Sequence, residues 1–129
     1  MIVHHQTIVV ATVRRESSEI CCKDLVDFMS GLVNEIEMTA LFDPIAIHGK
    51  FGFTGIVGIV TSHIAFHYFD DEQTLHLDVY SCKEYNIEAL MKFLNAYWDI
   101  SKAEVLFLIR NEDLSEKRFV YEFGVLKGV

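Results

Sequence analysis

The chain has 129 residues, a formal net charge of −8 and a hydrophobic fraction of 51%. This length suits one domain over residues 1–129, and the composition is that of a chain that buries a core. The charge argues against nucleic acid as a partner, because phosphate binding needs clustered Lys and Arg and the 11 basic residues are scattered. No apolar run approaches the roughly 18 residues of a membrane span, so we expect no membrane partner.

Targeting, disulfide and metal signals are missing from the sequence. The first ten residues, MIVHHQTIVV, lack a basic leader followed by a long apolar stretch, so we expect a cytoplasmic protein. Cys21, Cys22 and Cys82 are odd in number and lack C-x-x-C spacing, which argues against a disulfide framework. The six histidines form no H-x-x-x-H or H-E-x-x-H pattern on a helix, so we expect no metal site.

Two helices are predicted from apolar residues at helical spacing. Residues 6–13, rich in β-branched side chains, predict a strand before them. Ser17 and Ser18 are typical of a helix cap, and the first helix is predicted from near Glu19. A second helix is predicted from about residue 87 to residue 98. The apolar stripe of the first consists of Leu25, Phe28, Met29, Leu32 and Ile36, and that of the second of Leu90, Met91, Leu94 and Trp98.

Strand patterns account for most of the remaining chain. Residues 70–73 predict a hairpin turn between two of the strands. This order of elements predicts an α+β fold, a two-layer sandwich in which an antiparallel or mixed β-sheet carries two helices packed on one face. The other face then needs a partner or a second sheet if its residues are apolar. The further strands are predicted over residues 45–53, 55–60, 62–69, 74–80, 105–110 and 118–123.

Four side chains near the predicted hairpin have reactive groups: Thr54, Ser62, His67 and Cys82. Because the strands 62–69 and 74–80 run antiparallel, we expect the Ser62 end of one to lie near the Cys82 end of the other. The same residues also suit ordinary roles as a polar strand serine, a structural histidine and a packed cysteine. Spacing alone leaves both interpretations open.

Two stretches of the chain resemble the prokaryotic S-adenosylmethionine decarboxylases. Residues 52–67 read GFTGIVGIVTSHIAFH and residues 77–82 read LDVYSC. The family pattern is approximately G-V-S-G, four or five apolar residues and E-S-H-I-x-I-H, followed by D-[VI]-[FY]-[TS]-C. The separations match without a gap over residues 52–69 and again at Cys82.

This resemblance implies an enzyme that cleaves itself between Thr61 and Ser62 into chains 1–61 and 62–129. The Ser62 hydroxyl would attack the preceding carbonyl, and elimination from the resulting ester would leave a pyruvoyl cofactor at position 62. A pyruvoyl ketone that forms a Schiff base with the substrate amine supplies the electron sink that decarboxylation needs. The implied activity is decarboxylation of S-adenosylmethionine for spermidine synthesis.

The resemblance also implies roles for individual residues. His67 matches the base of the elimination step, and Cys82 matches the acid that reprotonates the substrate carbon. Thr54 matches a serine that assists processing and lines the site. Phe69 matches an aromatic side chain that stacks on adenine, and Asp71 matches a carboxylate near the nucleoside. Paired protomers that share residues at each site are typical of the family, so a homodimer is expected.

The chain departs from the family pattern at three places. Thr61 replaces a glutamate before the serine, and His48 stands where a second adenine-stacking aromatic is expected. Residues 70–73 lack the usual proline. A changed substrate, such as a basic amino acid, therefore stays open. So do an unprocessed, non-catalytic homologue that binds an adenosyl ligand or a protein partner, and an unrelated dimerisation module.

Overall fold

A computed structural model describes residues 2–129, which form one eight-stranded sheet and two α-helices. The strand order is β2-β3-β4-β5-β1-β6-β7-β8, and every neighbouring pair is antiparallel. The strands are β1 (His5–Val13), β2 (Ile45–His48), β3 (Gly52–Ile59), β4 (Ser62–Phe69), β5 (Thr74–Ser81), β6 (Ile100–Arg110), β7 (Leu114–Glu122) and β8 (Val125–Gly128). The helices are α1 (Cys22–Glu35) and α2 (Ile87–Trp98).

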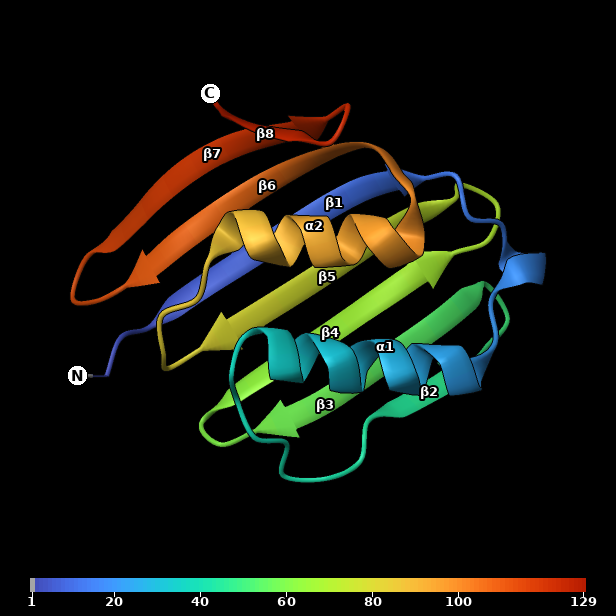
Figure 1. Ribbon diagram of the computed structural model, residues 1–129, viewed down its shortest axis with the longest axis horizontal. Coiled ribbons are helices and arrows are strands. Elements are labelled where there is room, and N and C mark those ends of the chain that lie inside the picture. The colour runs from blue at the N-terminus through green and yellow to red at the C-terminus, as the bar shows by residue number, and fades with distance from the viewer. Residues whose placement is uncertain (1) are drawn as a thin grey trace.

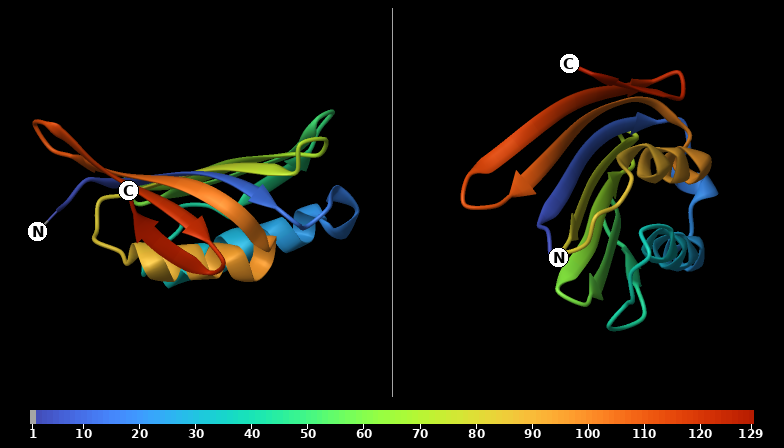
Figure 2. Two further views of the ribbon diagram at one scale, coloured as in Figure 1. Left: turned by 90° about the horizontal axis from the view of Figure 1, so that it is seen from above. Right: turned by 60° about the vertical axis from the view of Figure 1, so that its left-hand side comes forward.

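Both helices pack on the same face of the sheet (Figure 1). Seen from above and from the side, no other element of residues 2–129 covers the opposite face (Figure 2). The predicted two-layer α+β sandwich is confirmed, and the sheet is antiparallel rather than mixed. Among the described residues, neither helix is long and apolar enough to cross a membrane.

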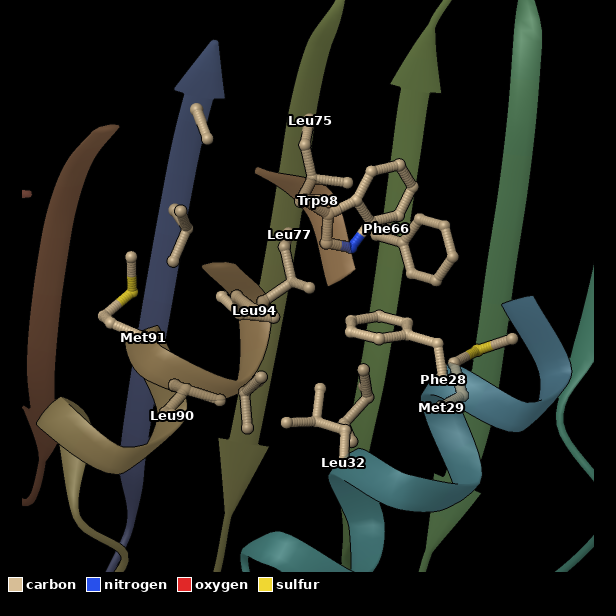
Figure 3. Close-up of a cluster of buried hydrophobic side chains, with 14 of the residues drawn as sticks. Phe28, Met29, Leu32, Phe66, Leu75, Leu77, Leu90, Met91, Leu94 and Trp98 are labelled. Atoms are coloured by element: carbon tan, nitrogen blue, oxygen red, sulfur yellow. The ribbon is translucent and has the colours of Figure 1, made fainter. Parts of the chain in front are cut away.

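The hydrophobic core lies between the sheet and the two helices (Figure 3). Trp98, at the end of α2, is fully buried and contacts aromatic rings from both layers. Its ring centroid lies 5.5 Å from that of Tyr68 and 5.7 Å from that of Phe66, both on β4. Phe28 of α1 lies 5.8 Å away, so this one side chain joins α1, α2 and the sheet.

The face of the sheet turned away from α1 and α2 is called the open face here. Side chains alternate between the two faces, as strand geometry requires. On β4, residues 62, 64, 66 and 68 are buried toward the helices, whereas residues 63, 65, 67 and 69 are at least partly exposed. Exposed apolar side chains on the open face include Val10, Ile45, Ile47, Ile56 and Phe69. The open face therefore carries exposed apolar side chains beside polar ones.

The predicted start of the first helix is wrong. Ser17 and Ser18 do not cap α1, because residues Ser17–Glu19 form a separate 3-10 turn. That turn is closed by the backbone N–H of Glu16, which donates to the Glu19 carboxylate at 2.8 Å. The chain is extended at Ile20, which is buried, and α1 begins only at Cys22.

Three strand boundaries also differ from the sequence-based expectation. The predicted strand 45–53 is two strands, because the chain turns at Gly49, whose N–H bonds Gly52 O at 2.7 Å. Strand β6 begins at Ile100, immediately after α2, because Asp99 reverses the chain in a left-handed conformation. A last strand, β8, was not predicted; it pairs with β7 through the tight turn at Phe123 and Gly124.

Candidate active site

A two-residue turn, Val60–Thr61, joins β3 to β4 and precedes the reactive serine. Ile59 pairs directly with Ser62, so the turn contains no further residue. Thr61 is exposed and has a φ of 51°, in the left-handed region. Positive φ is rare for residues other than glycine and is an outlier for a β-branched side chain. The peptide bond between Thr61 and Ser62 therefore follows a strained residue.

Cys82 lies directly beside this turn. Pairing of β4 with β5 aligns His63 with Tyr80, which brings the residue after β5 to the start of β4. The backbone N–H of Cys82 donates to Ser62 Oγ at 3.0 Å, and Thr61 Oγ1 lies 2.9 Å from Cys82 Sγ. The predicted proximity of Ser62 and Cys82 is confirmed. Thr61, Ser62 and Cys82 together are called the cleavage cluster below.

The surroundings of Cys82 lower the pKa of its thiol. A hydrogen bond from the Thr61 hydroxyl, and then one from the Ser62 hydroxyl, lower the pKa of Cys82 below its usual value. Partial burial opposes this shift, and the neighbouring Lys83 charge supports it. A thiol with a lowered pKa exchanges protons more readily near neutral pH, which general acid–base chemistry requires.

We expect Cys82 to be alkylated by iodoacetamide with a pH midpoint below the value of about 8.5 for a free cysteine. The thiolate is the reactive form, so a lowered pKa extends reactivity toward lower pH. Thr61→Val keeps the β-branched shape but removes the hydroxyl, so its midpoint should move upward. Peptide mass spectrometry reads Cys82 separately from Cys21 and Cys22, in a Ser62→Ala background that keeps the chain whole. An unchanged midpoint in Thr61→Val would contradict this interpretation of the hydrogen bond.

A second group of functional side chains lies on the open face and is called the histidine cluster. Thr54 on β3 pairs with His67 on β4, and Thr54 Oγ1 lies 3.0 Å from His67 Nδ1. The Phe69 ring lies 6.4 Å from the His67 ring and 5.4 Å from the His76 ring. Phe69 is 38% exposed. An exposed aromatic ring beside an imidazole can stack on a flat ligand ring while the imidazole moves a proton.

The cleavage cluster and the histidine cluster are apart within one chain. His67 lies five positions after Ser62 along β4, which at about 3.3 Å per residue corresponds to roughly 17 Å. Their side chains also belong to opposite rows of the strand, Ser62 with the buried residues and His67 on the open face. A hydrogen bond needs about 3 Å, so His67 does not reach Ser62 of its own chain.

The structure does not bring His48 to the histidine cluster. Its ring stacks on that of Phe53, with centroids 4.2 Å apart, and Phe53 is buried toward the helices. His48 therefore lies on the other side of β2 from the open face. Asp71 lies in the turn between β4 and β5, two residues beyond Phe69 and at the opposite end of β4 from Ser62.

A polar network on the open face was not predicted as part of the site. Asp78 accepts a hydrogen bond from Gln6 Nε2 at 2.8 Å and lies 3.3 Å from His63 Nε2. The Arg110 guanidinium lies 4.4 Å from the centroid of the Tyr80 ring. In the sequence, Asp78 and Tyr80 alternate with buried apolar residues of β5, which indicates the face but not the partners from β1 and β6. The part of the chain that the structure describes gathers no three His, Cys, Asp or Glu side chains able to hold a metal ion.

Comparisons with known proteins agree with this fold. The crystal structure of the adenosylmethionine decarboxylase from Aquifex aeolicus has a TM-score of 0.68 to this chain, at 17% sequence identity. The match covers 87% of this chain and 95% of that one, and it shows a common two-layer α+β fold. A family model described as S-adenosylmethionine decarboxylase matches residues 21–111. The protein therefore belongs to the S-adenosylmethionine decarboxylase family. No curated protein has a detectably similar sequence.

Proposed function

We propose that this protein is a pyruvoyl-dependent decarboxylase that cleaves itself between Thr61 and Ser62 and acts on S-adenosylmethionine. The observation that carries the proposal is the contact between Ser62 Oγ and the backbone N–H of Cys82 at 3.0 Å. This contact joins two residues of the family motif beside an exposed turn. The two chain ends that cleavage creates can move apart there. The product would supply the propylamine group of spermidine.

Self-cleavage is a rearrangement of the Thr61–Ser62 peptide. Ser62 Oγ forms a bond to the Thr61 carbonyl carbon, the bond from that carbon to Ser62 N breaks, and the hydroxyl proton goes to the freed nitrogen. A base then removes the Ser62 Cα proton, and the bond from Cβ to Oγ breaks. Thr61 leaves as a carboxylate at the end of chain 1–61. Water then displaces the Ser62 nitrogen, which leaves as ammonia. The new N-terminus at position 62 is a pyruvoyl group.

The residues around Ser62 fit this precursor. Ser62 Oγ accepts the Cys82 N–H through a lone pair and so keeps its own hydroxyl proton for the rearrangement. When formed, the pyruvoyl group supplies the electron-withdrawing carbonyl that decarboxylation needs. Cys82, with its lowered pKa, is the acid that returns a proton to the substrate carbon.

We propose that two copies complete each site. His67 is the base for the elimination step, yet about 17 Å of β4 separates it from Ser62 of its own chain. Pairing through the open faces would let the histidine cluster of one copy approach the cleavage cluster of the other. The exposed aromatic Phe69 would then stack on the adenine ring, with Thr54 supporting His67 and Asp71 near the nucleoside.

Release of labelled CO2 from carboxyl-labelled S-adenosylmethionine tests the activity. We expect release by the cleaved protein and none by Ser62→Ala, which cannot form the carbonyl. Labelled arginine and ornithine, assayed in parallel, test the changed-substrate alternative. Cleaved protein that releases no CO2 from any of these substrates would contradict the proposed activity. Uncleaved protein that binds S-adenosylmethionine without releasing CO2 would instead support a non-catalytic homologue.

A further inference from the structure

In the Val60–Thr61 turn, a β-branched residue occupies a backbone position that such residues rarely adopt. A turn with positive φ only at its second central residue favours Gly or Asn at that position. Val60 and Thr61 are both β-branched, and of the two only Thr61 has a positive φ. Among residues 2–129, Thr61 is the one β-branched residue with positive φ; the other non-glycine cases are Glu37, Gln73, Asp99 and Phe123.

The same chain contains a turn of equal length with glycine at its second position. Phe123 and Gly124 join β7 to β8 with φ values of 55° and 72°. That pattern is the favoured one, and a glycine occupies the second position at no steric cost. A glycine at position 61 would satisfy the Val60–Thr61 turn equally well, so the threonine there is not required by the hairpin.

Three contacts hold Thr61 in its left-handed conformation. Its hydroxyl lies 2.8 Å from Val60 O and 2.9 Å from Cys82 Sγ. The turn is also closed by pairing of Ile59 with Ser62, at the end of two eight-residue strands. Because β3 and β4 pair along their whole length, the strain is not relieved by small shifts of the flanking chain.

We propose that the left-handed backbone of Thr61 stores strain that accelerates cleavage of the Thr61–Ser62 bond. This inference rests on the proposed self-cleavage and adds a cause for its rate. When Ser62 Oγ replaces Ser62 N on the Thr61 carbonyl carbon, the path to Ser62 Cα gains one atom, since Oγ and Cβ replace N. The longer connection lets Thr61 return to an ordinary φ, so the strain favours the ester over the peptide.

The comparison of Thr61→Ala with Thr61→Gly isolates the backbone effect. Both variants lack the hydroxyl, but alanine keeps the Cβ that makes positive φ unfavourable, whereas glycine does not. We expect the glycine variant to be cleaved about tenfold more slowly than the alanine variant, which corresponds to about 1.4 kcal/mol. Pulse–chase labelling with methionine during cell-free synthesis measures the rate, since Met29 marks the first fragment and Met91 the second.

Gln73 provides the matched control. It has a φ of 49°, almost the same as Thr61, but lies in the turn at the other end of β4. Gln73→Ala and Gln73→Gly differ in the same backbone strain, away from the scissile bond. We expect these two variants to be cleaved at equal rates.

A stability measurement separates strain from loosening of the turn. In a Ser62→Ala background, which stays uncleaved, Thr61→Gly should unfold at higher urea concentration than Thr61→Ala. Equal cleavage rates for the alanine and glycine variants at position 61, or a glycine variant that is the less stable of the two, would overturn the inference. Failure of the unsubstituted chain to cleave would instead overturn the proposed function and with it the effect on rate. The urea comparison then still tests whether Thr61 is strained.

Discussion

We expect a chain carrying His67→Ala to be cleaved at Ser62 when it is paired with a chain carrying Ser62→Ala, although neither variant should be cleaved alone. The reason is the roughly 17 Å of β4 between the two residues, which prevents His67 from acting within its own chain. In the mixed dimer, the Ser62→Ala chain contributes His67 to the intact serine of its partner. Co-expression with two different affinity tags, followed by denaturing gels, measures the fraction of each chain that is cut.

The control for this experiment is a pair of chains that both carry His67→Ala. That pair contains intact Ser62 but no His67, so it should stay uncleaved. Cleavage in the mixed dimer is expected only for the His67→Ala chain, because the other chain lacks the serine. If the mixed dimer remains whole while the unsubstituted protein is cut, a site shared between two copies is contradicted.

We expect the replacement of Trp98 with alanine to lower the free energy of unfolding by about 3–5 kcal/mol. Trp98 is fully buried, and its ring contacts Phe28, Phe66 and Tyr68 from both layers of the sandwich. Truncation removes this apolar surface and leaves a cavity that the surrounding rings fill only in part. Urea unfolding in a Ser62→Ala background measures the change on an intact chain.

Two other variants mark the scale of this effect. Trp98→Phe keeps an aromatic ring, and the Trp98 indole N–H has no hydrogen-bond partner among the described residues. The free energy of unfolding should therefore fall less for Trp98→Phe than for Trp98→Ala. Phe51→Ala removes a ring that is 68% exposed and should change stability by about 0.5 kcal/mol or less. A loss below about 1 kcal/mol for Trp98→Ala would contradict the placement of this side chain at the centre of the core.

The fold could be predicted largely from periodicity. The second helix, the hairpin and the approach of Cys82 to Ser62 follow from local pattern and antiparallel pairing. The start of the first helix could not, because Ser17 and Ser18 suit either a cap or a 3-10 turn. Burial of Ile20 and the contact between Glu16 and Glu19 determine which one forms.

The candidate site could be predicted only in part. The odd spacing between Ser62 and His67 already places them on opposite faces of a strand, a signal that the motif match obscured. The position of His48 depends on its pairing with Phe53 in a neighbouring strand. The left-handed conformation of Thr61 arises from pairing of the strands on both sides, against the local preference of a β-branched residue.

The most direct measurement for the central claim is the intact mass of freshly purified protein under denaturing conditions. The account predicts two fragments, residues 1–61 and residues 62–129, with the second carrying a blocked N-terminus that borohydride reduces. Ser62→Ala, purified in the same way, should give one species. A single species near 14.8 kDa for the unsubstituted protein, persisting after long incubation, would contradict self-cleavage and the decarboxylase function that depends on it.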